Sequence, residues 1–141
     1  MSACIQRQAM KRAQIKRRGK RMKSVRKRLW PEFSKLIRKR DGRCLVADDH
    51  RFVCGGSLQA SHIYPKGQYP LLELFPLNVK TLCWRHHIGW WHKNPSEASA
   101  WAHRYFPQEW WDRLETARIN SLSRKGWTAE QHRAEWTAYG L

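Results

Sequence analysis

Long apolar runs are missing from this sequence of 141 residues. No stretch approaches the roughly eighteen apolar residues that cross a membrane, and the basic N-terminus lacks the apolar segment of a secretory signal. We therefore expect a cytoplasmic protein without a membrane partner. Cysteines number only four, and cytoplasmic thiols stay reduced. Cysteines that cluster with histidines then indicate metal more often than disulfides. Cys4 lies far from the other three and is expected to be a free thiol.

Acidic residues are almost missing from the N-terminal part of the chain. Residues 1–40 contain sixteen Lys and Arg and one acid, whereas residues 41–141 contain twelve Lys and Arg and ten acids. The net charge of +17 is therefore concentrated in the first part. Such a basic arm favours a polyanionic partner, most simply DNA. The alternative is a solvated tail that only aids solubility. The side chains expected to contact DNA phosphates are Arg17, Arg18, Arg26, Lys27 and Arg28 in the arm, and Lys66, Arg85 and Lys93 near the core histidines.

The patterning predicts an α+β protein in three parts. A basic arm covers residues 1–29, a core residues 30–95, and a helical extension residues 96–141. The first 28 residues have too few apolar side chains to fold alone. Their helix propensity is good, so they could become helical along a phosphate backbone.

The core is expected to open with a helix at Pro31, because proline suits the first helical turn. Asp41 and Gly42 are a stop signal for this helix. The remaining elements expected in the core are a strand over residues 58–63, a loop over 64–77, renewed order over 78–82 and the start of a helix over 83–92.

The extension contains three helix starts. Asn94 and Pro95 give an N-cap followed by proline, and Glu97 would complete a capping box. The later signals are starts at Pro107 and at Thr128 with Gln131, and a stop at Gly140. Most of the nine tryptophans are expected in the core, and one or two exposed ones could stack on bases.

One candidate metal set consists of Cys44, Cys54, Cys83 and His86. Zinc prefers four thiolate or imidazole ligands in a tetrahedron. Cys83 and His86 have the spacing of a zinc knuckle, whereas nine residues separate Cys44 from Cys54. The alternative is that these are small buried side chains and a surface histidine. A bound zinc would stabilise a small core.

A second candidate set consists of His62, Asn78, His87 and His92. If a helical turn begins at His87, His92 lies about one turn further on, and the two imidazoles could hold one divalent ion. Such an ion can stabilise the leaving oxygen of a phosphodiester. His62 could take a proton from water, and Asn78 could fix its orientation. The alternative is a scatter of unrelated histidines.

At these residues the chain resembles the HNH endonuclease family, which has a ββα-metal fold. The resemblance lies in the segment ASHIYP and in LNVKTLCWRHH. It implies that His62 is the general base, that Asn78 positions it, and that His87 binds the catalytic metal, with His92 as a further ligand. It also implies a zinc knuckle, here built from Cys83-x-x-His86 with Cys44 and Cys54.

Ser61 departs from the pattern of this family. Many members place Asp or His, a metal ligand, directly before the general base. The departure favours an imidazole-tolerant catalytic ion such as Mn, Zn or Ni over strict Mg. The C-terminal part resembles small HNH proteins of bacteriophages, including the NinG-like recombination proteins. This resemblance implies a phage-encoded enzyme, active in the host cell cytoplasm.

The sequence thus predicts a metal-dependent DNA endonuclease acting in recombination, replication or packaging, with structural zinc and a catalytic divalent ion. Two alternatives stay open. One is a zinc-stabilised nucleic-acid-binding module without cleavage. The other is a phage assembly or interaction factor with a protein partner. A homodimer is compatible with each of them.

Overall fold

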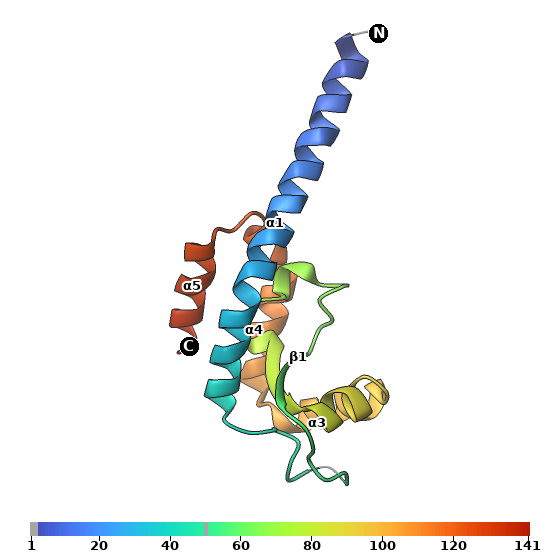
Figure 1. The fold of residues 1–141 in the computed structure, drawn as a ribbon, viewed down its shortest axis with the longest axis vertical. Coiled ribbons are helices and arrows are strands. Elements are labelled where there is room, and N and C mark those ends of the chain that lie inside the picture. The colour runs from blue at the N-terminus through green and yellow to red at the C-terminus, as the bar shows by residue number, and fades with distance from the viewer. Residues whose placement is uncertain (1–2, 50) are drawn as a thin grey trace.

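The computed structural model describes residues 3–49 and 51–141, with side chains from residue 5 onward except 19–24. The fold is α+β, as predicted: one antiparallel pair of strands lies among helices (Figure 1). The helices are α1 (Ala3–Asp41), α2 (Trp84–His86), α3 (Pro95–Tyr105), α4 (Gln108–Ile119) and α5 (Ala129–Ala138), with a π turn η3 (His87–Trp91) and 3-10 turns η1 (Pro70–Leu72), η2 (Pro76–Asn78) and η4 (Ser121–Arg124). The strands are β1 (Leu58–His62) and β2 (Val79–Cys83). None of the helices in the described residues combines the length and apolarity that a membrane span needs.

Helix α1 is continuous through Pro31, so the predicted helix start at that residue is wrong. Leu29, Phe33 and Ile37 follow one another at four-residue spacing and are buried. The apolar stripe therefore begins before Pro31 and binds the helix to the core on both sides of it. This packing offsets the hydrogen bond that a proline inside a helix loses. The predicted stop is confirmed, since α1 ends at Asp41 and Gly42 has a φ of 68°.

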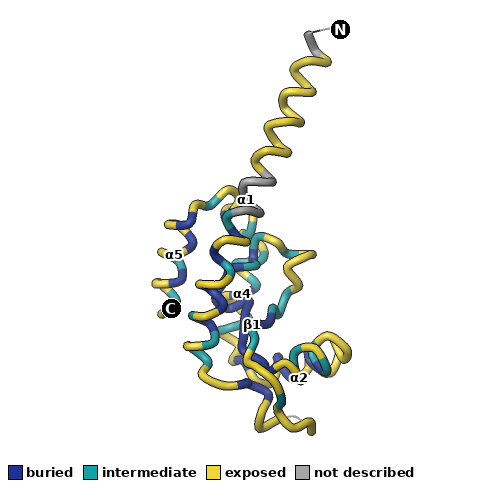
Figure 2. Tube along the Cα trace, viewed as in Figure 1, coloured by how far each residue is buried: buried dark blue, intermediate teal, exposed yellow. Residues whose placement is uncertain are grey.

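Residues 5–18 of α1 are exposed and lie in the part of the helix that projects away from the rest of the chain (Figure 2). The second half of the helix forms one wall of the core. Ala60 of β1 and Val79 of β2 pack with the buried stripe of α1. The sheet therefore has one face against α1 and leaves its other face to α2 and η3.

The strands pair with Leu58 opposite Cys83 and His62 opposite Val79. The strand expected over residues 58–63 and the order expected over 78–82 are both confirmed, within one residue. The connection between them is longer than a tight turn. It contains η1 and η2 and has buried side chains of its own, which are Leu72, Leu74, Phe75, Pro76, Leu77 and Asn78.

The C-terminal helices begin close to the predicted residues. Pro95 starts α3, but the side chain of Asn94 caps nothing and donates instead to the carbonyl of Trp90. The capping box predicted there is therefore wrong. Thr128 and Gln131 form a capping box at the start of α5, as predicted. Helix α5 returns to α1, where Trp136 packs on Phe33 at 5.0 Å between ring centroids.

Candidate functional site

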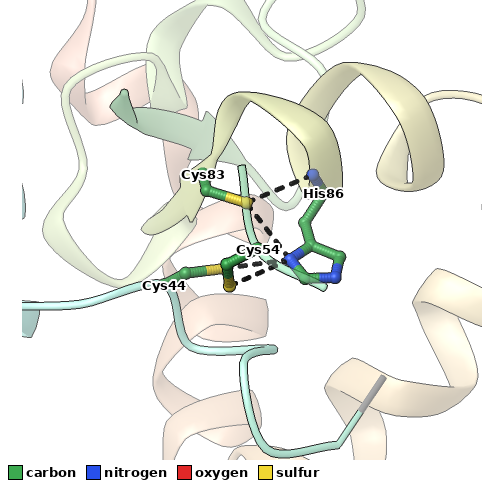
Figure 3. Close-up of side chains that lie close together, drawn as sticks. All are labelled: Cys44, Cys54, Cys83 and His86. Atoms are coloured by element: carbon green, nitrogen blue, oxygen red, sulfur yellow. Dashed lines mark hydrogen bonds between the residues drawn. The ribbon is translucent and has the colours of Figure 1, made fainter. Parts of the chain in front are cut away.

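Cys44, Cys54, Cys83 and His86 converge on one point (Figure 3). Their ligand atoms all lie within 4.8 Å of one another. The Nδ1 atom of His86 is 3.3 Å from the sulfur of Cys44, 3.5 Å from that of Cys54 and 3.2 Å from that of Cys83. The set predicted from the sequence is thus brought together as three thiols and one imidazole, a donor set that suits zinc.

Local backbone geometry explains this convergence. Cys83 ends β2, and the first turn of α2 places His86 beside it, with the amide of His86 donating to the Cys83 sulfur. Cys44 follows the end of α1 and Cys54 precedes β1, and their sulfur atoms nevertheless lie within 4.8 Å of each other. Gly56 has a φ of 78°, and a Cβ at this position would lie 2.7 Å from the Cβ of Trp84. Glycine is therefore required where the loop turns into the sheet.

Hydrogen bonding leaves the four side chains suited to a cation. His86 donates its Nε2 proton to the carbonyl of Phe52 at 2.8 Å, so the lone pair of Nδ1 faces the sulfurs. A backbone carbonyl orients metal-binding imidazoles in this way. Burial raises the pKa of the Cys44 and Cys54 thiols. Burial acts to raise the pKa of Cys83, but hydrogen bonds from the amides of Gly55 and His86 and from the other two thiols together lower it. The cluster can hold a metal such as zinc.

On the far side of α2 lies a cleft of about 840 Å³. His62, His87 and His92 all line it, together with the basic side chains of Arg38 and Lys66. Its other polar or aromatic lining side chains include Trp30, Ser34, Gln59, Tyr64, Trp91, Ser99, His103 and Trp111. The lining contains no carboxylate among the described residues. The cleft is therefore suited to an anionic ligand.

His87 and His92 face each other across the π turn, with their Nε2 atoms 3.0 Å apart. Five residues are about 1.4 turns of an α-helix, which would separate these side chains. The π turn instead has bonds from residue i+5 to residue i, and the amide of His92 donates to the carbonyl of His87. The helix predicted over residues 83–92 is thus present in a form that aligns the two rings.

The pair also has the chemistry of two metal ligands. Two nitrogens that each bind one ion at about 2.0–2.1 Å can lie about 3 Å apart. His87 Nδ1 donates to the side-chain oxygen of Gln59 at 2.8 Å, which leaves its Nε2 lone pair facing His92. Burial, and then the charge of His92, lower the pKa of His87 to about 4. His87 is therefore neutral near pH 7, as a ligand must be.

His62 ends β1 and stacks on Trp30 of α1, with 5.0 Å between ring centroids. Its Nε2 lies 3.0 Å from the carbonyl of Glu73 and donates to it. The basic nitrogen is therefore Nδ1. Burial lowers the pKa of His62 to about 4, and the Glu73 carbonyl opposes the shift only in part. His62 is a neutral imidazole with a defined tautomer at physiological pH.

Asn78 is fully buried and holds the segment that follows His62. Its Oδ1 accepts from the amide of Tyr64 at 2.8 Å, and its Nδ2 donates to the carbonyls of Tyr64 and Leu72 at 3.1 Å. The backbone carbonyl of Asn78 also accepts from Ile63 at 2.7 Å. Asn78 therefore positions His62 through the backbone, rather than through a contact with its ring.

The predicted DNA-binding residues fall in different places. Arg17, Arg18, Lys27 and Arg28 are exposed on α1, and Lys66 and Lys93 are exposed near the cleft. Arg26 is a correction, because it is buried and donates to the Glu73 carboxylate at 3.0 Å. Arg85 is exposed, donates to the carbonyl of Val53 and lies against Gly55, and its contact with DNA stays a prediction. The predicted free thiol, Cys4, lies outside the described side chains.

Lys80 is a buried residue that sequence reasoning missed. Its Nζ lies 3.1 Å from the centroid of the Trp91 ring and 3.4 Å from both Ser61 Oγ and the His62 carbonyl. Burial lowers its pKa well below the usual range, and Asp41 opposes the shift. The period of two along paired strands puts Ser61 and Lys80 on one sheet face, but nothing in the sequence shows that the ammonium has no exit to solvent.

Comparisons of the chain with protein-family models, with curated proteins and with solved structures gave no match.

Proposed function

We propose that the protein is a metal-dependent DNA endonuclease of the HNH type, with structural zinc on the Cys3His cluster. One observation carries the proposal. A neutral histidine whose lone pair is on Nδ1 lines the same cleft as a pair of facing imidazoles, and none of the described residues that line it is a carboxylate. The order of β1, β2 and the α2–η3 turn supports a ββα-metal core.

In the proposed reaction, Nδ1 of His62 accepts a proton from a water molecule, whose oxygen attacks phosphorus. The bond from phosphorus to the 3′-oxygen breaks, so the products carry a 5′-phosphate and a 3′-hydroxyl. A divalent ion on His87 and His92 would supply charge stabilisation to the leaving oxygen. Arg38 and Lys66 line the cleft and attract the phosphates on either side of the reacting one. Lys93, next to His92, adds a third positive charge to those of Arg38 and Lys66.

Two positioning groups support the proposed base. Trp30 limits the tilt of the His62 ring, and the Glu73 carbonyl selects its tautomer. The side-chain oxygen of Gln59 selects the tautomer of His87. Because imidazoles rather than carboxylates would bind the catalytic ion, Mn, Ni or Zn is favoured over Mg.

The test is cleavage of supercoiled plasmid by metal-stripped protein, with Mg, Mn, Ni and Zn added back. His62→Ala is expected to lose conversion to open-circle or linear DNA while it still binds DNA. His103→Ala is the matched control, since His103 lines the same cleft but stacks on Trp111 outside the proposed machinery. Wild-type protein that binds DNA and cuts with none of the four ions would contradict the proposal.

A second candidate function is a nucleic-acid-binding module that does not cleave. The feature that favours it is Ser61, which is buried and bonded to Lys80 where many HNH enzymes have a metal ligand. In that case His62→Ala would leave the only activity, binding, unchanged.

We further propose that the protein is phage-encoded and works in the host cytoplasm in DNA recombination, replication or packaging. A phage assembly or interaction factor is the third candidate, and it predicts a stable protein complex and no dependence on divalent ions.

A further inference from the structure

Helix α1 belongs to two parts of the molecule at once. Residues 5–18 are exposed (Figure 2), and the C-terminal half of the helix lines the cleft with Trp30, Ser34 and Arg38. These three residues are spaced by four, so they form one face of the helix. Because α1 is continuous, the direction of that face is defined along the exposed half as well.

Two basic residues of the exposed half lie on this same face. Arg12 precedes Trp30 by eighteen residues, and Lys16 precedes Ser34 by eighteen, which is about five complete helical turns. Both side chains are exposed, and so is Lys27, which lies between them and the cleft. At 1.5 Å per residue, Arg12 is about 27 Å from Trp30 along the axis.

The apolar residues of the exposed half argue against other partners. Ile5, Met10 and Ile15 are 53%, 65% and 70% exposed. They are five residues apart, about 1.4 turns, so they point in three different directions and form no stripe. A coiled-coil partner or a membrane surface would need such a stripe. Residues 5–18 contain six basic side chains and no acidic one, and this charge selects a polyanion.

We propose that duplex DNA in the cleft extends along this face of α1, so that Arg12 and Lys16 contact phosphates about eight base pairs from the cleaved bond. The inference rests on the proposed nuclease function and names its substrate. About 27 Å corresponds to about eight base pairs at 3.4 Å each. Duplex DNA is stiff over this distance and stays beside a straight helix, which a flexible single strand does not.

The first experiment maps cuts on a blunt 40-base-pair duplex with each strand end-labelled in turn. The arm lies on one side of the cleft, so wild-type protein needs about eight base pairs of duplex on that side. Each strand is expected to lack cuts near one of its ends and to be cut closer to its other end. The end that lacks cuts is expected to have the same polarity, 5′ or 3′, in both strands. Cuts equally close to both ends would overturn the proposal.

Two double variants that each remove two positive charges distinguish contacts made by one face of α1 from a general electrostatic attraction. Arg12→Gln with Lys16→Gln is expected to lose the cut-free zone and to weaken binding about tenfold or more. Arg7→Gln with Lys11→Gln is the matched control on another face of the same helix, and it is expected to keep the zone. Equal behaviour of the two variants would overturn the proposal.

If the protein cuts with none of the metals, the nuclease proposal fails, and binding alone decides the placement of the arm. The probes are a fluorescent 24-base-pair duplex and a single strand of the same length, titrated at several salt concentrations. Loss of Arg12 and Lys16 is expected to reduce the duplex salt slope by about 1.8, or 0.9 per phosphate. The control variant is expected to change it far less. Tighter binding of the single strand, or equal slopes for both variants, overturns the inference.

Discussion

His86 and His87 are neighbours in the chain, yet they belong to opposite kinds of site. His86 is fully buried and faces three sulfurs, with all four ligand atoms within 4.8 Å of one another. His87 is half-buried, and its Nε2 faces one further possible ligand, His92, in the wall of an open cleft. A set of four ligands closes the coordination of zinc, whereas a set of two leaves positions for water and substrate. Two consecutive residues thus belong to a cluster that could hold a structural metal and to the proposed catalytic site.

The two sites also differ in what orients them. The Cys3His cluster is held mainly by backbone groups, from Phe52 and Gly55 among others. The open pair is held by a side chain, Gln59, and by the π turn itself. Backbone support makes the closed site part of the fold. We therefore expect its loss to unfold the protein and the loss of the open site to leave the fold in place.

Removal of one thiol is expected to have the largest effect. Cys83→Ala leaves three ligands, and structural zinc sites contribute about 10–16 kcal/mol of apparent binding free energy, a large part of which is folding free energy. The variant is expected to lose zinc and cooperative thermal unfolding, and a strong chelator should do the same to wild type. Zinc content by mass spectrometry and a thermal melt provide the measurement. Cys4→Ala is the control, because the four ligands are complete without it. If metal-free Cys83→Ala unfolded cooperatively at the temperature of wild type, the cluster would not be needed for folding, and the proposed difference between the two sites would be wrong.

Loss of one member of the open pair is expected to affect activity and spare the fold. His92→Ala removes one of two proposed ligands, and cleavage should fall by about a hundredfold or more. The thermal melt should stay near that of wild type, because His92 is exposed. A titration with Mn measures the effect, and His103→Ala serves again as the control. A His92→Ala protein that melts like Cys83→Ala would show that both sites are structural.

Much of this arrangement could be predicted from the sequence, for definite reasons. The thiol cluster was predictable because cysteines are scarce and Cys83 and His86 have knuckle spacing. The pairing of His87 with His92 was only approximate, since five residues match one turn of a π-helix and not of an α-helix. The continuity of α1 through Pro31 was missed because tertiary packing overrode a local start signal. Lys80 was missed because burial of a lysine has no local signature.

The acid side of the pH profile tests the base of the open site. The pKa of His62 is lowered to about 4, mainly by burial. Its neutral form therefore persists down to about pH 5, and kcat/KM should be flat from pH 7 to about 5, be halved near pH 4 and fall about tenfold per unit below that. Because the folded pKa lies below the usual 6.5, the unfolded chain binds the proton better between these values, so stability also falls as pH falls through this range. A break near pH 6.5 would point to an exposed histidine instead.

Replacement of the buried lysine beneath the open site is expected to have the smallest effect. Lys80→Met keeps the length of the side chain, removes a desolvated amine and gives up its contact with Trp91. These changes oppose each other, so stability near pH 7 should stay within about 1 kcal/mol of wild type. Because burial lowers the folded pKa of Lys80, the unfolded chain binds its proton better below the unfolded pKa, and wild type gains stability as pH rises. The variant lacks this gain. Urea unfolding at pH 6, 8 and 9.5 should therefore show its relative stability decline with pH. A large loss at every pH would mean that the ammonium itself supports the strands beneath the cleft, so that the open site, like the closed one, depends on a buried cation.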